Sequence, residues 1–330
     1  MTWFEKLTEI NETSPEQVQH ELSVEGDFLV CPSGKRIACG RLITPKLSEL
    51  RELVRASDVA IGRATIAEVV GDVRQLHADS ANANALFQVA SQFNLLEMAS
   101  PTVTPEQGVG IYENDHTQGP ACAIACGAGT IYRNYFAPVQ DSIGQTAHRQ
   151  IDCSADLGQC LGNAHGRLWS MQNGYLFPTD DGLDSIATRL LESTENERDK
   201  LRGELRIGVQ SDAAVTLPGA QHRVSQAYCS ALPVAYGRQP QEQWAGFAQF
   251  ILDAAYEATL CAAILNTVRT GCNRLCLTLL GGGVFGNRDE WIVKAIERAM
   301  LKFRDFDLDI QVVSYNRSKP IVANLVSRLH

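Results

Sequence analysis

The stretch that decides the fold runs from Leu275 to Met300 and reads LCLTLLGGGVFGNRDEWIVKAIERAM. It begins with an apolar run, LCLTLL, that predicts a buried strand, and it ends with apolar residues at helical spacing, among them Ile292 and Ile296. Four glycines stand between the two patterns, at 281, 282, 283 and 286. Glycine lets the main chain approach a ligand closely. The loop therefore predicts a phosphate or diphosphate site at a helix N-terminus, where free N–H groups favour an anion. A tight connection without a ligand is the alternative.

The sequence around this loop predicts a three-layer α/β/α fold with a mixed, largely parallel sheet. Apolar residues recur at three and four from Trp244 to Val268, which predicts a long helix that ends at Thr270-Gly271. IQVVSY, near the C-terminus, predicts the last strand, and IAEVVGDV and ALFQVASQF predict two earlier ones. The alternation of helices with buried strands is typical of this architecture.

Two flanking regions interrupt that pattern. Residues 1–60 are interpreted as an N-terminal extension with a helix starting at Ser14 and a hairpin around PSGK, and residues 61–330 as the main domain. Residues 138–205 are interpreted as an insertion, a lid or a docking surface. It ends in the charged run STENERDKLRGEL, which predicts a solvated helix face.

Composition narrows the class of protein. The chain has 330 residues, of which 45% are apolar and 20% charged, as in an ordinary globular protein. Its net charge of −9 argues against nucleic acid or an anionic membrane as a partner. No signal sequence or apolar membrane span is evident, so we expect a cytoplasmic protein, with signal-independent secretion as the alternative. The ten cysteines lack metal-ligand spacing, so we expect reduced thiols, no metal and no cofactor.

The glycine loop fits two known phosphate motifs poorly. No Gly-Lys-Ser/Thr follows it, so it is not a Walker loop. Gly281, Gly283 and Gly286 satisfy G-x-G-x-x-G, but only one more strand fits before His330, whereas a dinucleotide-binding unit continues with several. Asn287 followed by Glu290 resembles a helix cap, which would place the loop directly at the helix start.

The last third of the chain resembles a macrodomain, the ADP-ribose-binding fold. That family has a helix containing Ala-Tyr, an apolar strand, a Ser-Thr-Gly-x-Tyr/Phe-Gly loop and a helix with small residues. Here the order is DAAYEATLCAAILNTV, LCLTLL, GGGVFGN and WIVKAIERAM. Earlier in the chain, VVGDVRQL and ALFQVASQFNLLEM match the family's first two strands, and ENDHTQGPACAIA takes the place of its first glycine loop. The resemblance spans residues 66–137 and 205–325.

Two departures refine this resemblance. Three glycines replace the family's Ser-Thr-Gly, and SQFN replaces its Asn-Ala-Ala-Asn. The chain is most similar to effector-type macrodomains that remove ADP-ribose from arginine of ubiquitin, which in turn resemble poly(ADP-ribose) glycohydrolases. The glycohydrolase signature Gly-Gly-Gly followed by Gln-Glu-Glu is absent, so that family's catalytic glutamates have no counterpart by motif.

The resemblance implies an ADP-ribose site. Asp72 would bind the adenine amino group, Asn94 the distal ribose, and Tyr315 and Asn316 would lie beside adenine. Phe285 would lie near the distal ribose. The diphosphate would lie between two groups of residues, which are Asn114, Gln118, Gly119 and Pro120 on one side and Gly281, Gly282, Gly283, Val284, Phe285, Gly286 and Asn287 on the other.

Cleavage of an ADP-ribosyl bond needs a carboxylate that holds or deprotonates water at the anomeric carbon. The densest polar cluster, YENDHTQGP, supplies Asp115 as the first candidate, Glu113 as the next and His116 as a proton carrier. A surface turn is the alternative interpretation of this cluster. Asp212, flanked by apolar runs, is a second candidate acid or a turn cap.

We therefore expect an ADP-ribosylhydrolase that acts on modified protein side chains, with arginine as one target. Its partners would be ADP-ribose or an ADP-ribosylated protein, including a ubiquitin-like one. A non-catalytic ADP-ribose reader is the alternative, and a nicotinamide-dependent oxidoreductase is a third possibility.

Overall fold

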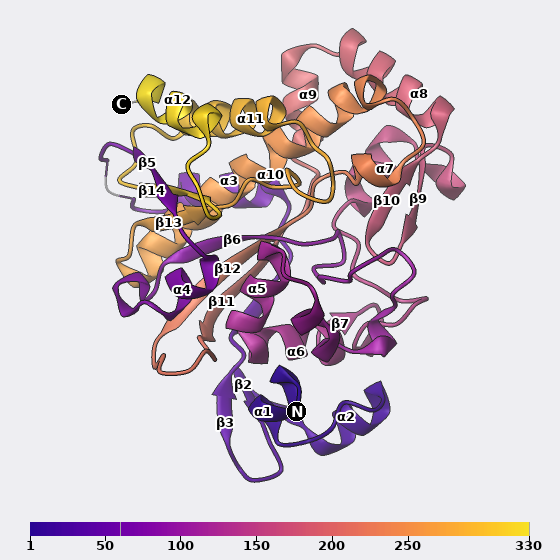
Figure 1. The fold of residues 1–330 in the computed structure, drawn as a ribbon. Coiled ribbons are helices and arrows are strands. Elements are labelled where there is room, and N and C mark those ends of the chain that lie inside the picture. Colours follow the sequence, from indigo (N-terminus) through magenta and orange to yellow (C-terminus); the bar gives the residue numbers. More distant parts are fainter. Residues whose placement is uncertain (60, 330) are drawn as a thin grey trace.

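A computed structural model describes residues 1–59 and 61–329 (Figure 1). Its centre is a seven-stranded mixed sheet. The five strands from β12 to β5 run parallel, and β4 and β11 add an antiparallel edge. In spatial order the strands are β4 (Arg41–Ile43), β11 (Gly208–Ala214), β12 (Arg223–Cys229), β6 (Leu86–Ala90), β13 (Arg274–Leu277), β14 (Asp309–Ser314) and β5 (Thr65–Val70).

Helices cover both faces of this sheet, which confirms the predicted three-layer α/β architecture (Figure 1). One layer contains α3 (Leu47–Ala56), α8 (Asp180–Glu192), α9 (Glu195–Arg202), α10 (Gln241–Thr270), α11 (Asp289–Lys302) and α12 (Pro320–Leu329). The other contains α4 (Val73–Ala78), α5 (Gln118–Ala125) and α6 (Gly127–Tyr135). The predicted long helix is α10, and its Gly271 cap has the left-handed conformation that glycine tolerates. The sequence did not predict α12.

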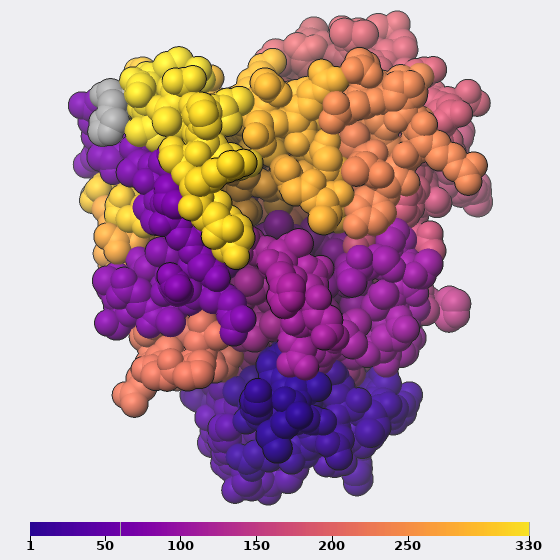
Figure 2. Space-filling view, viewed as in Figure 1, coloured from indigo at the N-terminus to yellow at the C-terminus, as the bar shows by residue number. Residues whose placement is uncertain are grey.

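Residues 1–59 contribute to two parts of the structure. Helices α1 (Trp3–Thr8) and α2 (Pro15–Glu21) pack with a three-stranded sheet, β1 (Ser23–Glu25), β2 (Phe28–Val30) and β3 (Arg36–Ala38) (Figure 2, indigo). Their buried residues share one hydrophobic cluster with residues of α5 and α6. However, β4 belongs to the main sheet and α3 packs on α10. Within residues 1–59, the elements from β4 onward therefore belong to the main sheet and the helices that cover it. Ala60 itself lies outside the described residues.

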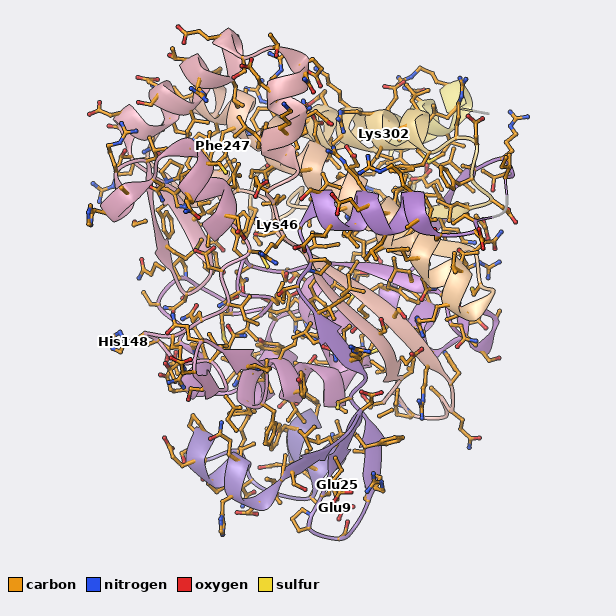
Figure 3. The ribbon with its side chains drawn as sticks, turned by 180° about the vertical axis from the view of Figure 1, so that it is seen from behind. Glu9, Glu25, Lys46, His148, Phe247 and Lys302 are labelled. Carbon is orange, nitrogen blue, oxygen red and sulfur yellow. The ribbon has the colours of Figure 1, made fainter. Side chains whose placement is uncertain are left out.

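The insertion is tied to the rest of the chain. It comprises β7 (Pro138–Val139), β8 (Ser142–Ile143), α7 (Ala155–Leu161), β9 (Trp169–Gln172), β10 (Tyr175–Pro178), α8 and α9. Lys46, at the start of α3, bonds Asp156 at 2.9 Å and Glu204 at 2.8 Å (Figure 3). These ion pairs connect the insertion to the segment that enters the main domain.

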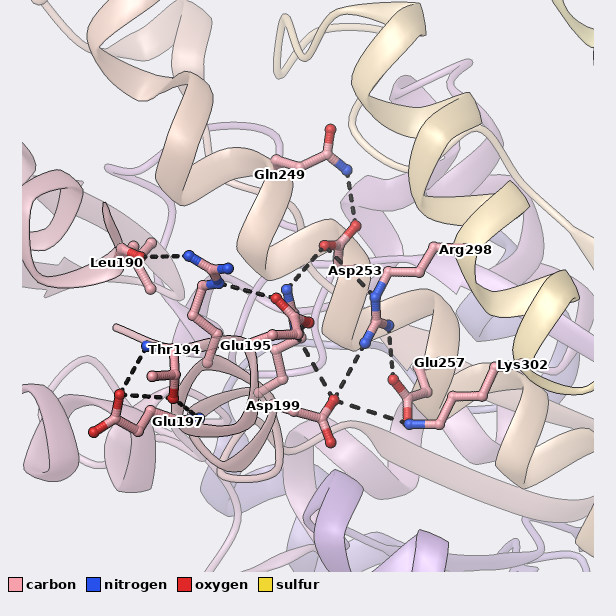
Figure 4. Close-up of polar contacts among 12 residues, drawn as sticks. Leu190, Thr194, Glu195, Glu197, Asp199, Gln249, Asp253, Glu257, Arg298 and Lys302 are labelled. Carbon is pink, nitrogen blue, oxygen red and sulfur yellow. Dashed lines mark hydrogen bonds and ion pairs between the residues drawn. The ribbon is translucent and has the colours of Figure 1, made fainter. Parts of the chain in front are cut away.

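An ionic network around one buried acid shows that the charged run at 193–205 is more than a solvated face. Asp199 of α9 pairs with Arg298 at 3.2 Å (Figure 4) and with Arg51 at 2.8 Å. Glu257 of α10, fully buried, bonds the same arginines and Lys302. Burial alone would raise the pKa of Glu257, but the hydrogen bonds from these three cations lower it to about 2. The network therefore joins α3, α9, α10 and α11.

Three global features bear on function. Helix α10 has the length and apolarity of a membrane span, but 89% of that stretch is buried inside the protein. All ten cysteines are free thiols, and eight are buried. Among residues 1–59 and 61–329, no group of three or more His, Cys, Asp or Glu side chains is arranged to hold a metal ion.

Candidate functional site

A cavity of about 1190 Å³ lies beyond the carboxyl ends of β6, β13 and β14. Figure 2 shows the surface hollowed between the yellow C-terminal segment and the magenta segment that contains α5. Ligands of open α/β sheets bind at this edge because the loops that follow parallel strands meet there. The cavity brings together most of the predicted binding residues, namely Asp115, His116, Gln118, Gly119, Pro120, Gly281, Gly282, Gly283, Val284, Phe285 and Tyr315.

The glycine loop forms one wall of this cavity. Gly281 has φ of +73°, and a Cβ there would lie 2.5 Å from the Ala231 Cβ, so only glycine fits. A Cβ on Gly283, by contrast, would meet nothing within 4 Å. In the part of the chain that the structure describes, the amides of Gly283, Val284 and Phe285 donate to no partner. These N–H groups are therefore available to a ligand.

The predicted helix cap is wrong. Helix α11 begins at Asp289, and its N-cap residue is Arg288, which makes no side-chain capping bond. The Asn287 amide instead donates to the Leu232 carbonyl at 2.8 Å. Because Asn287 is buried and held there, it fixes the base of the glycine loop rather than the helix start.

The segment that leads into α5 forms the opposite wall. The Asp115 carboxylate accepts from the Thr117 amide at 2.9 Å, and Gln118 accepts from the Val73 amide at 3.1 Å. A Cβ on Gly119 would lie 2.5 Å from both the Ala90 carbonyl oxygen and Glu97 Oε2. Glycine at 119 therefore lets α5 approach the end of β6 and the Glu97 side chain.

Glu97 is the acid that sequence reasoning missed. It lines the cavity, its residue exposure is 5%, and its Oε1 is buried without a hydrogen-bond partner in the described chain. Burial raises the pKa of this carboxyl well above its usual range; Arg133 lowers it and Asp115 raises it further. A raised pKa favours the protonated form of the Glu97 carboxyl, which is the form that can act as a general acid.

The residues around Glu97 hold it in place. Its amide donates to the Tyr112 hydroxyl at 2.9 Å. Arg133 is fully buried, donates to the Leu95 carbonyl at 3.1 Å and lies over the Tyr228 ring at 3.6 Å. The guanidinium is thus held by backbone and aromatic contacts, and its charge acts on Glu97 without an ion pair to it.

Aromatic rings line the cavity beside these acids. Tyr175, Tyr236 and Phe285 lie with ring centroids 5.3 to 5.8 Å apart. Tyr175 comes from β10 of the insertion, and its hydroxyl donates to the Met98 carbonyl at 2.7 Å. The insertion therefore supplies part of the cavity wall.

Five predicted binding residues line neither this cavity nor a smaller one that adjoins it. Asn94 is fully buried, with its amide on Gln150 and its oxygen accepting from the Leu96 amide. The Asn94 side chain thus binds the backbone of the turn that follows β6, and it does not reach the cavity. The other four are Asn114, Gly286, Asn287 and Asn316.

Asp212, the second candidate acid, lies away from the cavity. It lies at a bulge of β11 with φ of +59° and pairs with Arg269 at the end of α10. Asp212 lines neither this cavity nor the smaller one beside it. In the structure Asp212 therefore forms an ion pair at the edge of the sheet, and it does not meet the other candidate acids.

A second cavity of about 620 Å³ adjoins the first and shares Asp115, His116, Gln118 and Tyr315 with it. Asp72 lines this second cavity and caps α4 by accepting from the Arg74 amide at 2.8 Å. Glu113 lies here too, and its carboxylate accepts from the Trp3 amide at 3.0 Å. Asp72 and Glu113 thus line the second cavity alone, whereas Asp115, His116 and Tyr315 line both.

Comparisons with known proteins give limited information. No family model and no curated protein matches the sequence. Among solved structures, the poly(ADP-ribose) glycohydrolase of Thermomonospora curvata matches with 14% identity, 96% coverage of each chain and a TM-score of 0.45. That of Deinococcus radiodurans in complex with ADP-ribose matches with 14% identity, 88% and 92% coverage and a TM-score of 0.44. Similarities this weak do not assign a function.

Proposed function

We propose that this protein binds ADP-ribose and hydrolyses the bond between ADP-ribose and a modified protein side chain. The observation that carries the proposal is one cavity with free main-chain amides at Gly283–Phe285 on one wall and a buried, partner-free carboxyl oxygen of Glu97 on another. Backbone amides suit a diphosphate because they bind anions without adding net charge. Because the chain carries a net charge of −9, an anionic ligand has to be held by such local N–H groups.

The two acids divide the chemistry. Glu97, whose pKa is raised by burial, gives a proton to the leaving side chain as the glycosidic bond breaks. Asp115 lines the same cavity and accepts a proton from the water that attacks the anomeric carbon. The products are ADP-ribose and the unmodified side chain. His116, exposed at the junction of the two cavities, exchanges the proton with solvent.

Arginine is the proposed attachment site, and an ADP-ribosylated ubiquitin-like protein is the proposed macromolecular substrate. Tyr175, Tyr236 and Phe285 support arginine, because aromatic rings favour a guanidinium leaving group. Comparing release of ADP-ribose from arginine-, serine- and glutamate-linked peptides tests this assignment. Fastest release from serine would exclude it.

Calorimetric titration with ADP-ribose, NAD, ADP and AMP, followed by a turnover assay, tests the main proposal. We expect ADP-ribose to bind most tightly and to be released from modified protein. Binding without turnover would leave a reader module. Preference for NAD would favour an oxidoreductase, although β13 is followed only by α11, β14 and α12 in the described chain.

A further inference from the structure

The N-terminal extension contacts the segment that precedes Asp115 at several points. The Trp3 indole N–H donates to the Val109 carbonyl at 3.1 Å, and the Trp3 amide donates to Glu113 at 3.0 Å. Glu12 makes the most concentrated contact. Its carboxylate accepts from the amides of Val109 at 2.8 Å and Gly110 at 2.6 Å.

Glu12 occupies a position shaped for a carboxylate. It accepts a third hydrogen bond, from the Tyr135 hydroxyl of α6, at 2.7 Å. A Cβ on Gly108 would lie 2.7 Å from the carboxylate, and one on Gly110 would lie 2.6 Å from it. Burial raises the pKa of Glu12, and its three hydrogen bonds oppose that rise. Two glycines on either side of Val109 and three converging donors thus surround one acid.

The held segment leads directly to both proposed catalytic acids. Gly110 begins the short helix η3 (Gly110–Asn114), which Asp115 ends as its C-cap. Within η3, the Tyr112 hydroxyl accepts the amide proton of Glu97. A shift of η3 would therefore move Asp115 and release the backbone of Glu97 at once.

We infer that Glu12 is a positioning residue, which acts through η3 to fix Glu97 and Asp115 relative to each other. The inference rests on the proposed hydrolase function. It gives the extension a role in turnover without a contact to the ligand, since Glu12 does not line the main cavity. Misplacement of reacting groups by about 1 Å costs as much as 10²-fold in rate.

Glu12→Gln tests the inference, with Glu9→Gln as the matched control. Glu9 (Figure 3) lies in the same extension, and in the described chain its side chain makes a 3.9 Å ion pair with Lys35 and no hydrogen bond. Both carboxylate oxygens of Glu12 accept hydrogen bonds, so in E12Q the side-chain NH₂ group must face at least one of the three donors. At that point a hydrogen bond is lost and two donors repel each other. We expect kcat on ADP-ribosylated protein to fall about 10- to 100-fold, with KM and the ADP-ribose Kd within twofold of wild type. E9Q should leave kcat unchanged.

Tyr135→Phe is the milder second variant, because it removes one donor and keeps the carboxylate. A smaller loss of kcat in the same direction supports the inference. Wild-type kcat in a folded E12Q overturns it, as does a KM increase with unchanged kcat. If E12Q does not fold, wild-type kcat in Y135F overturns it.

A third measurement does not depend on catalytic turnover. The side-chain carboxyl of Glu97, observed by ¹³C NMR, should titrate at lower pH in E12Q and Y135F than in wild type, because a displaced η3 admits water beside it. If wild type binds ADP-ribose but hydrolyses no conjugate, the proposed function fails and this titration alone decides. An unchanged Glu97 titration then overturns the positioning role.

Discussion

Replacing Gly283 with alanine separates a ligand-binding loop from a merely tight connection. Gly283 lies outside the positive-φ region, and a Cβ there would meet nothing within 4 Å. The fold therefore has no need of glycine at this position. If the loop only joined β13 to α11, G283A would be silent or slightly stabilising, by up to about 1 kcal/mol through the lower entropy of the unfolded chain.

A ligand changes that expectation. A methyl group at 283 projects into the open space of the cavity wall, beside the free amides of Val284 and Phe285. Loss of one hydrogen bond to a charged phosphate costs about 1.5–3 kcal/mol, or about 10- to 150-fold in Kd. G283A should therefore weaken ADP-ribose binding by that factor while the melting temperature stays at or above that of wild type.

Two further glycines calibrate the result. Gly281→Ala forces φ of +73° on alanine and places its Cβ 2.5 Å from the Ala231 Cβ, so we expect a loss of stability of about 2–5 kcal/mol. Gly246 is exposed on α10 and has open space around its Cβ position, so Gly246→Ala should stabilise the protein without changing binding. Calorimetric titration with ADP-ribose and thermal unfolding measure all three variants. Wild-type affinity in G283A would refute the argument that the glycine loop binds the diphosphate.

The remaining predictions concern the two catalytic acids and the ionic network. Glu97→Gln should lower turnover by about 10²- to 10⁴-fold and keep ADP-ribose affinity. Burial raises the pKa of Glu97 in the folded state, so the folded protein keeps a proton that the unfolded chain loses above about pH 4.3. The stability of the wild type therefore falls as pH rises above that value. E97Q should thus unfold at a higher temperature than wild type at pH 7, and this difference should disappear near pH 4. Asp115→Ala should also abolish turnover while keeping affinity, and unchanged turnover would remove Asp115 from the mechanism. Glu257→Gln should cost about 3–5 kcal/mol in urea unfolding because it leaves buried cations unpaired, whereas exposed Glu52→Gln should change stability by less than about 0.5 kcal/mol. The Glu257 contribution is present above its unfolded pKa and is lost as pH falls toward about 2.

The elements of the fold were predictable wherever one periodicity continued long enough. Helix α10 and strands β13 and β14 lie where spacing placed them, because their apolar residues face a single core. The extension was predicted less well. β4 is only three residues long, and nothing local shows that it pairs with β11, which follows about 165 residues later.

The loops on both sides of the cavity were also predictable, because their residue types restrict the backbone. Gly281 has a conformation that other residues avoid, and Gly119 lies against the end of β6 where a Cβ has no room. Asn287 was assigned to the correct loop with the wrong task. Its side chain binds Leu232, and the partner of an asparagine depends on tertiary approach rather than on spacing.

The choice between Asp212 and Glu97 shows where sequence reasoning stops. Each is a single acid among apolar neighbours, so the argument that made Asp212 a candidate applies equally to Glu97 in LLEM. The structure separates them through residues distant in sequence. Asp212 meets Arg269, 57 positions later, and is neutralised by it, whereas Glu97 meets Gly119 and Tyr112, which enclose it without supplying a cation at bonding distance. Enclosure without a bonded cation raises the pKa of the Glu97 carboxyl, whereas Asp212 forms an ion pair. The chemical role of each acid is therefore set by the residue that folding brings to it.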